Sequence, residues 1–265
     1  MKKTLVWFLA FLITAASAIY QRVTGPTYPV KGSANFAGLN IKYKLPRSAE
    51  NTEPCRLVVN LPDSAPADLQ GYLEFRRHKT DAPWNILAMK REGQQLVGFL
   101  PKQPAAGKLE YFIHLVRDSQ EISITGEKPV VIRFKGPVPG PLLLAHVLVI
   151  FLAMLFSTQA GLTALLSKDG YTGVVKWAAI LMFIGGFILG PLIQKFAFGV
   201  FWSGFPLGKD LTDTKTLIAM LAWIAALASG RKTQPKRTWV IAASIITLMV
   251  FLVPHSWLGS ELKWQ

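Results

Sequence analysis

The 265-residue sequence contains a single cysteine, Cys55. One thiol excludes an internal disulfide framework and any multi-cysteine zinc or iron–sulfur site built by this chain alone. The sequence also lacks a Walker motif, a Gly-x-Ser-x-Gly nucleophile elbow, a His-Glu-x-x-His zinc motif and a Cys-x-x-Cys-His haem-attachment motif. The common signatures of P-loop NTPases, serine hydrolases, metalloproteases and c-type cytochromes are therefore missing.

Charged residues are scarce, at 17% of the chain, whereas hydrophobic residues make up 51% and the mean hydropathy is +0.33. This balance is typical of a membrane protein. The 29 Lys and Arg residues exceed the 15 Asp and Glu residues and give a formal charge of +14. These basic residues are spread over both halves and do not cluster beside stacking aromatics, which argues against a nucleic-acid partner.

The N-terminus begins with two lysines and an apolar stretch from Thr4 to Tyr20. A basic start and a small-x-small sequence ending at Ala18 are typical of a secretory signal peptide. The length of the stretch, and the aromatic residues Trp7 and Tyr20 near its ends, instead favour a transmembrane anchor over residues 1–20. Both interpretations predict that the segment that follows is exported.

Four further apolar segments predict membrane helices at residues 141–166, 174–195, 214–230 and 238–255. The third is short for a full span and must take residues from the preceding loop. Cationic residues crowd the loop between the third and fourth segments and flank the loop between the first and second: Arg231, Lys232, Lys236, Arg237, Lys168 and Lys176. The positive-inside rule therefore places these loops and the N-terminus in the cytoplasm, and the C-terminal tail outside.

Residues 21–138 have the composition of a soluble β domain, with short apolar or alternating segments between turn-forming residues. We predict eight strands, at residues 35–43, 56–61, 70–76, 85–90, 95–100, 108–116, 121–125 and 130–134. The clearest is the strand from Lys108 to Val116, where Leu109, Tyr111, Ile113 and Leu115 share one face and the residues between them share the other, with period two. The number and spacing of the strands predict an immunoglobulin-like or fibronectin-like β-sandwich.

Basic residues in this domain suggest a positively charged face for a partner protein: Arg76, Arg77, Lys79, Lys90 and Arg91. The alternative is a solvated surface on either side of a hairpin. The proline-rich segment 135–141 after the domain predicts a short, semi-rigid spacer that keeps the sandwich close to the membrane.

Two histidines accompany the membrane helices, His146 in the first and His255 after the last. Their distances from the cytoplasmic flanks place both near the outward membrane boundary. Two imidazoles at similar depth could ligate haem b axially or share a metal ion. The alternative is that both are interfacial histidines without a ligand.

The loop from Phe198 to Thr216 has an aromatic first half and a polar second half. Trp202 and Phe205 are expected at the membrane interface or at a partner. Asp213 is predicted to cap the following helix. With Asp210 it also forms a carboxylate pair that could bind a divalent cation, against the alternative of capping and salt bridges.

Three segments of the chain resemble a set of uncharacterised bacterial inner-membrane proteins: 25–30, 202–216 and 254–262. The resemblance implies an exported β-sandwich, residues 21–138, followed by a four-helix membrane domain, residues 139–265, in a bacterial inner membrane. It implies no activity and no catalytic residue.

Together these observations favour a non-catalytic inner-membrane anchor or scaffold, with the lipid bilayer and a membrane or periplasmic protein as partners. A membrane redox subunit with haem b or a metal between His146 and His255 is the alternative. A small transporter is a third hypothesis, although the helices lack the intramembrane carboxylates and inverted repeat that carriers usually have.

Overall fold

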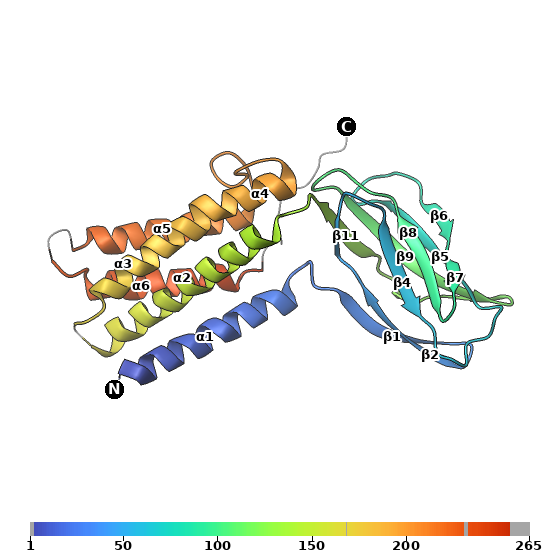
Figure 1. The fold of residues 1–265 in the computed structure, drawn as a ribbon, viewed down its shortest axis with the longest axis horizontal. Helices are drawn as coiled ribbons and strands as arrows, with labels where there is room; N and C mark the ends of the chain where they lie inside the picture. Colours follow the sequence, from blue (N-terminus) through green and yellow to red (C-terminus); the bar gives the residue numbers. More distant parts are fainter. Residues whose placement is uncertain (1–2, 168, 231–232, 255–265) are drawn as a thin grey trace. The chain divides into compact units, whose positions relative to one another are not determined.

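The computed structural model describes residues 3–167, 169–230 and 233–254. The described residues form two compact units: a helical unit, made of the residues up to Pro26 and of Val138–Pro254, and a β unit, Thr27–Pro137 (Figure 1). An N-terminal apolar helix, a β-sheet region and a C-terminal helical region follow one another along the chain, as the sequence predicted.

The helical unit contains α1 (Lys3–Thr24), α2 (Gly140–Leu166), α3 (Thr172–Phe183), the π-helical turn η1 (Ile184–Leu189), α4 (Gly190–Phe198), α5 (Leu211–Ala228) and α6 (Arg237–Leu252). Within the described residues, four helices are long and apolar enough to cross a membrane: α1, α2, α5 and the continuous helix from α3 to α4. Helix α6 is apolar but has only 16 residues. The five predicted helices are confirmed as apolar helices, and four of them have the length and composition of membrane spans, which suggests a membrane protein.

Helix α1 packs against α2 and α6. Trp7 meets Phe156 of α2 edge to face, with 5.2 Å between ring centroids. At its other end, Gln21 donates from Nε2 to the carbonyl oxygen of Phe251 in the last turn of α6, at 2.7 Å. The residues of α1 that are buried in the unit are Val6, Ala10, Thr14 and Ser17. Their small side chains allow the helices to approach closely.

Two helix connections lie at the same end of the helical unit. The Arg237 guanidinium donates to the last carbonyls of α2, at 2.5 Å to Ala164 and 2.6 Å to Leu165. Tyr171, just before α3, donates its hydroxyl to the carbonyl of Pro235 at 3.0 Å. The α2–α3 and α5–α6 connections therefore share one end, and the α4–α5 loop lies at the other.

Glycines let the long helix from α3 to α4 pack tightly against its neighbours. A Cβ atom at Gly185 would clash with Ile150 of α2, and one at Gly186 would clash with Thr216 of α5. The helix widens to a π-turn here, where the Gly190 amide donates to the Gly185 carbonyl. Because Pro191 has no N–H to donate, it is easily accommodated beside such an irregularity.

The β unit begins with a hairpin of β1 (Val30–Phe36) and β2 (Leu39–Leu45). The prediction of one strand over residues 35–43 is wrong. Ala37 and Gly38 both have positive φ, 51° and 75°, and reverse the chain within two residues. Such a turn matches the twist of the flanking strands. Of these two residues only Gly38 is typical of turns, so the sequence pattern did not predict the reversal.

The remaining strands form two sheets. The first has the order β3 (Ser48–Glu50), β11 (Val130–Lys135), β9 (Lys108–Arg117), β5 (Gln70–Arg77) and β6 (Asn85–Ala88), with β10 (Gln120–Ser123) also paired to β9. The second has the order β4 (Cys55–Asn60), β8 (Gln95–Leu100) and β7 (Lys90–Glu92). The predicted strand 85–90 therefore divides, because the chain crosses from one sheet to the other at buried Met89.

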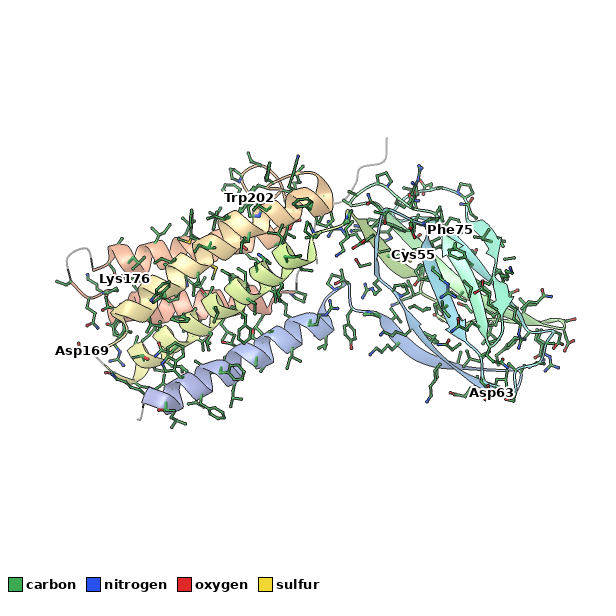
Figure 2. All side chains as sticks on the ribbon, in the orientation of Figure 1. Cys55, Asp63, Phe75, Asp169, Lys176 and Trp202 are labelled. Carbon is green, nitrogen blue, oxygen red and sulfur yellow. The ribbon has the colours of Figure 1, made fainter. Side chains whose placement is uncertain are left out.

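Both sheets contribute side chains to a single core. The alternation predicted for β9 is confirmed, since four of its residues lie in this core: Leu109, Tyr111, Ile113 and Leu115. Opposite them lie Leu57 and Val59 of β4 and Leu96 and Leu100 of β8. The half-buried Cys55 packs against the same core, and burial raises the pKa of its thiol (Figure 2). A higher pKa lowers the fraction of the thiolate, which is the nucleophilic form.

Candidate functional site

The six-stranded sheet turns a second, largely polar face away from the core. Side chains alternate along a strand, so the neighbours of the core residues in β5 and β9 share this face. The strands place Tyr72 opposite His114, Glu74 opposite Phe112, and Arg76 opposite Glu110. We call these six residues, with the adjacent His78, Trp84 and Glu121, the β5–β9 face.

Aromatic rings form a row along the β5–β9 face. His114 stacks on Tyr72 with 4.5 Å between ring centroids and 1° between the planes. Phe112 lies 5.9 Å from His114, and Trp84 lies 5.4 Å from Phe112. The Arg76 guanidinium covers the Trp84 ring at 4.4 Å, a cation–π contact. The row joins residues from β5, β9 and the segment before β6.

Glu110 holds the side chains of Arg76 and His78 at one end of this row. Its carboxylate accepts from Arg76 Nε at 2.5 Å and contacts His78 Nδ1 at 2.8 Å. Burial raises the pKa of the Glu110 carboxyl, but the hydrogen bonds from His78 and Arg76 outweigh burial, so that the pKa is lower than usual. Arg76 is therefore fixed in place and its charge is largely balanced.

His114 is held between two carboxylates at the other end of the row. Its Nε2 lies 3.0 Å from Glu74 and its Nδ1 lies 2.9 Å from Glu121. Ionised carboxylates only accept hydrogen bonds, so a ring nitrogen that bonds to one of them is the donor. Tyr72 also donates to Glu121, and burial, this hydrogen bond and the nearby carboxylates raise the pKa of Tyr72 to about 12. The rings are thus held in fixed orientations.

The basic residues predicted to form a positive face have different surroundings. Arg76 belongs to the six-stranded sheet, whereas Lys90 and Arg91 belong to the three-stranded sheet. The Arg91 guanidinium donates to the carbonyl oxygens of Pro66 and Ala65, the latter at 3.1 Å. Arg76 and Arg91 therefore help to hold the β unit together, while Lys90 is exposed.

In the helical unit, His146 contacts the π-turn of the neighbouring helix. Its Nδ1 lies 3.1 Å from the carbonyl oxygen of Gly185. A carbonyl oxygen only accepts, so Nδ1 carries the hydrogen and Nε2 of the neutral ring has a lone pair. His255 lies outside the described residues. Within residues 3–167, 169–230 and 233–254, no group of three or more His, Cys, Asp and Glu side chains is arranged to hold a metal ion.

The two aspartates of the α4–α5 loop have separate structural roles. Asp210, not Asp213 as predicted, is the cap of α5, and its carboxylate accepts from the Thr212 amide at 2.7 Å. The helix begins at Leu211, which places Asp213 within its first turn. The Asp213 carboxylate instead accepts from the amides of Ser203 and Gly204, at 2.7 and 3.0 Å. Both carboxylates are buried.

The loop around Asp213 is polar inside and apolar outside. Trp202 stacks on Phe187 of η1 at 5.5 Å and donates from Nε1 to the Phe205 carbonyl at 3.1 Å (Figure 2). Phe205 in turn donates its amide to the Thr214 hydroxyl at 3.0 Å. Phe205 and Leu207 are 63% and 79% exposed. Trp202 and Phe205, predicted to lie at the membrane interface or at a partner, therefore belong to a loop that is anchored by hydrogen bonds and has an exposed apolar rim.

Sequence reasoning missed the aromatic row and the role of Lys215. The alternation of His114 with Phe112, and the strand pattern around Tyr72, are the sequence signals for a shared face. Lys215 is buried, and its Nζ donates to the Val253 carbonyl at the end of α6, at 2.6 Å.

No protein-family model matches this chain, and a comparison with curated proteins finds no match. The site is therefore interpreted from its geometry.

Proposed function

We propose that this chain is a non-catalytic membrane anchor whose β unit, an immunoglobulin-like sandwich, binds a partner protein. In this proposal the membrane is a bacterial inner membrane and the β unit lies in the periplasm. The helices fix the β unit near the bilayer, where it docks a neighbouring membrane protein or a periplasmic protein.

The β5–β9 face carries this proposal. Trp, Tyr and Arg are the residue types that dominate the energetics of protein interfaces. Trp84, Tyr72 and Arg76 are held there by ring stacking and by hydrogen bonds to carboxylates. Since their conformations are already fixed, a partner loses little side-chain entropy in binding them. A surface with these properties is better suited to binding than to chemistry.

Charge distribution supports the orientation. The end of the helical unit that holds the α2–α3 and α5–α6 connections contains Lys236 and Arg237, and α1 begins there. Basic residues at one end of a membrane bundle favour the cytoplasmic side. The chain leaves α1 and enters α2 at the opposite end, so the β unit belongs to the non-cytoplasmic side.

The proposal is tested by comparing partner recovery from membranes that contain the tagged full-length chain. Trp84→Ala should lower the recovery of cross-linked partner at least fivefold, because it removes the ring at the end of the row and the support for Arg76. Quantitative mass spectrometry after cross-linking gives the readout. Arg56→Ala is the matched control, since it breaks an exposed ion pair with Glu92 on the three-stranded sheet. Equal recovery from the two variants would contradict the proposal.

A specific observation favours the redox subunit as a second candidate. Metal-ligating histidines usually donate their other ring nitrogen to a carbonyl or carboxylate, and His146 has this arrangement with Gly185. If Nε2 binds haem b or a metal, the purified chain should show a reduced-minus-oxidised haem band or stoichiometric metal. His146→Ala should abolish that band or metal, and its persistence in the variant would rule out His146 as the ligand.

A further inference from the structure

Strand β6 is the edge of the six-stranded sheet next to the β5–β9 face. It is the last strand in the sheet order, after β5. All four of its residues are exposed, including Ile86 at 71% and Leu87 at 42%. Since successive side chains point to opposite faces, an apolar side chain is exposed on each side of the strand.

The backbone of β6 is oriented for a further strand. The Met89 amide donates to the Gly71 carbonyl at 2.8 Å, so Met89 faces β5. Backbone groups alternate along an antiparallel ladder, and Leu87, opposite Leu73, therefore also faces β5. The N–H and C=O groups of Ile86 and Ala88 consequently point away from β5, toward the open edge.

The opposite edge of the same sheet is protected in the usual way. Strand β3 has three residues, Ser48, Ala49 and Glu50, which are small or charged. Natural proteins protect their edge strands by shortness, charge or proline, because an exposed edge pairs with other chains. Strand β6 is also short, but its four residues include no charge and no proline. Its apolar side chains are therefore a feature to be explained.

The charges around β6 indicate what kind of strand it would accept. Arg77 and Lys79 lie before it and Lys90 follows it, whereas Asp81 is the acidic residue in the segment between Arg77 and Lys90. The whole segment 27–137 has sixteen Lys and Arg against eleven Asp and Glu. An antiparallel pair of two β6 strands would bring the basic flank of one copy against the basic flank of the other. An acidic partner is thus favoured over a second copy.

We propose that β6 binds an extended segment of the partner protein by strand addition, and that this segment is apolar with acidic flanks. The added strand pairs with the outward N–H and C=O groups of Ile86 and Ala88. Its side chains contact Ile86 on one side and Leu87 on the other. The inference rests on the proposed partner-binding function and specifies how the partner is recognised.

The probe is the fluorescent peptide acetyl-Glu-Glu-Val-Thr-Val-Thr-Val-Glu-Glu, titrated into the full-length chain in detergent and followed by anisotropy. Ala88→Pro should weaken binding at least tenfold, because it removes an outward N–H without removing a hydrogen bond to β5. Ala88→Val, which keeps the N–H, should retain binding. Hydrogen exchange at the Ile86 and Ala88 amides should slow when the peptide binds.

Three results would overturn strand addition: no binding of the acidic peptide, equal binding of its lysine-flanked counterpart, or equal affinity for the Ala88→Pro and Ala88→Val variants. The cross-linking comparison of Trp84→Ala with Arg56→Ala separates this failure from failure of the proposed function. If Trp84→Ala still lowers partner recovery, the chain binds a partner by another route. If it does not, both proposals fail.

Discussion

Replacing Asp213 with alanine should release the α4–α5 loop from the helices. The buried carboxylate accepts from the amides of Ser203 and Gly204. A hydrogen bond to a charged group contributes about 1.5–3 kcal/mol, and a buried donor left without an acceptor is costly. Since about 1.4 kcal/mol corresponds to a tenfold change, exchange of these two amides should accelerate by roughly tenfold to a hundredfold. Hydrogen–deuterium exchange of the full-length chain measures this directly.

Two further variants separate the carboxylate from the cap of α5. Asp213→Asn keeps one acceptor oxygen and should accelerate exchange less than alanine does. Asp210→Asn retains a residue that caps helices well and should leave the Ser203 and Gly204 amides protected. If Asp213→Ala leaves both amides as protected as in the unaltered chain, the carboxylate does not hold the loop.

Replacing Trp223 with alanine should strongly destabilise the helical unit. Trp223 of α5 is fully buried, and its indole Nε1 donates to the Thr247 hydroxyl of α6 at 2.9 Å. Truncating a buried Trp or Phe to Ala costs about 3–5 kcal/mol, because lost contacts and a residual cavity both contribute. We therefore expect a markedly lower midpoint of thermal unfolding for the variant in detergent.

A tryptophan exposed on the surface of the helical unit provides the control. Trp177 of α3 is 55% exposed in the helical unit, so its truncation leaves no internal cavity. Trp177→Ala should shift the unfolding midpoint much less than Trp223→Ala. Equal shifts would mean that α5 and α6 do not pack through Trp223.

The membrane helices were predictable because their cause is local. A bilayer requires about 20 consecutive apolar residues, with every backbone group bonded within the helix. That requirement is visible in the composition of each segment, so α1, α2 and the helix from α3 to α4 were found. Their ends were less certain. The predicted start at residue 214 for α5 missed the first turn, which begins at Leu211 because Asp210 caps it.

The β unit was predictable where one face of a strand is buried. The alternation in β9 correctly separated core residues from the others. It did not reveal the reversal at Ala37 and Gly38, where an alanine takes a conformation that favours glycine. Nor did it reveal the crossing at Met89, because the residues on both sides of the crossing are extended and have the composition of a strand.

By itself, the sequence determined the class of protein, the order of its helical and β regions and the pattern of buried residues in β9. Tertiary structure alone decided which functional side chains meet. Tyr72 lies beside His114 because of the β5–β9 register, and Asp213 lies beside Ser203 because the loop folds back on α5. Such contacts join residues that are distant along the chain, and their energies depend on strand register and helix packing. Neither strand register nor helix packing has a local sequence pattern from which it could be predicted.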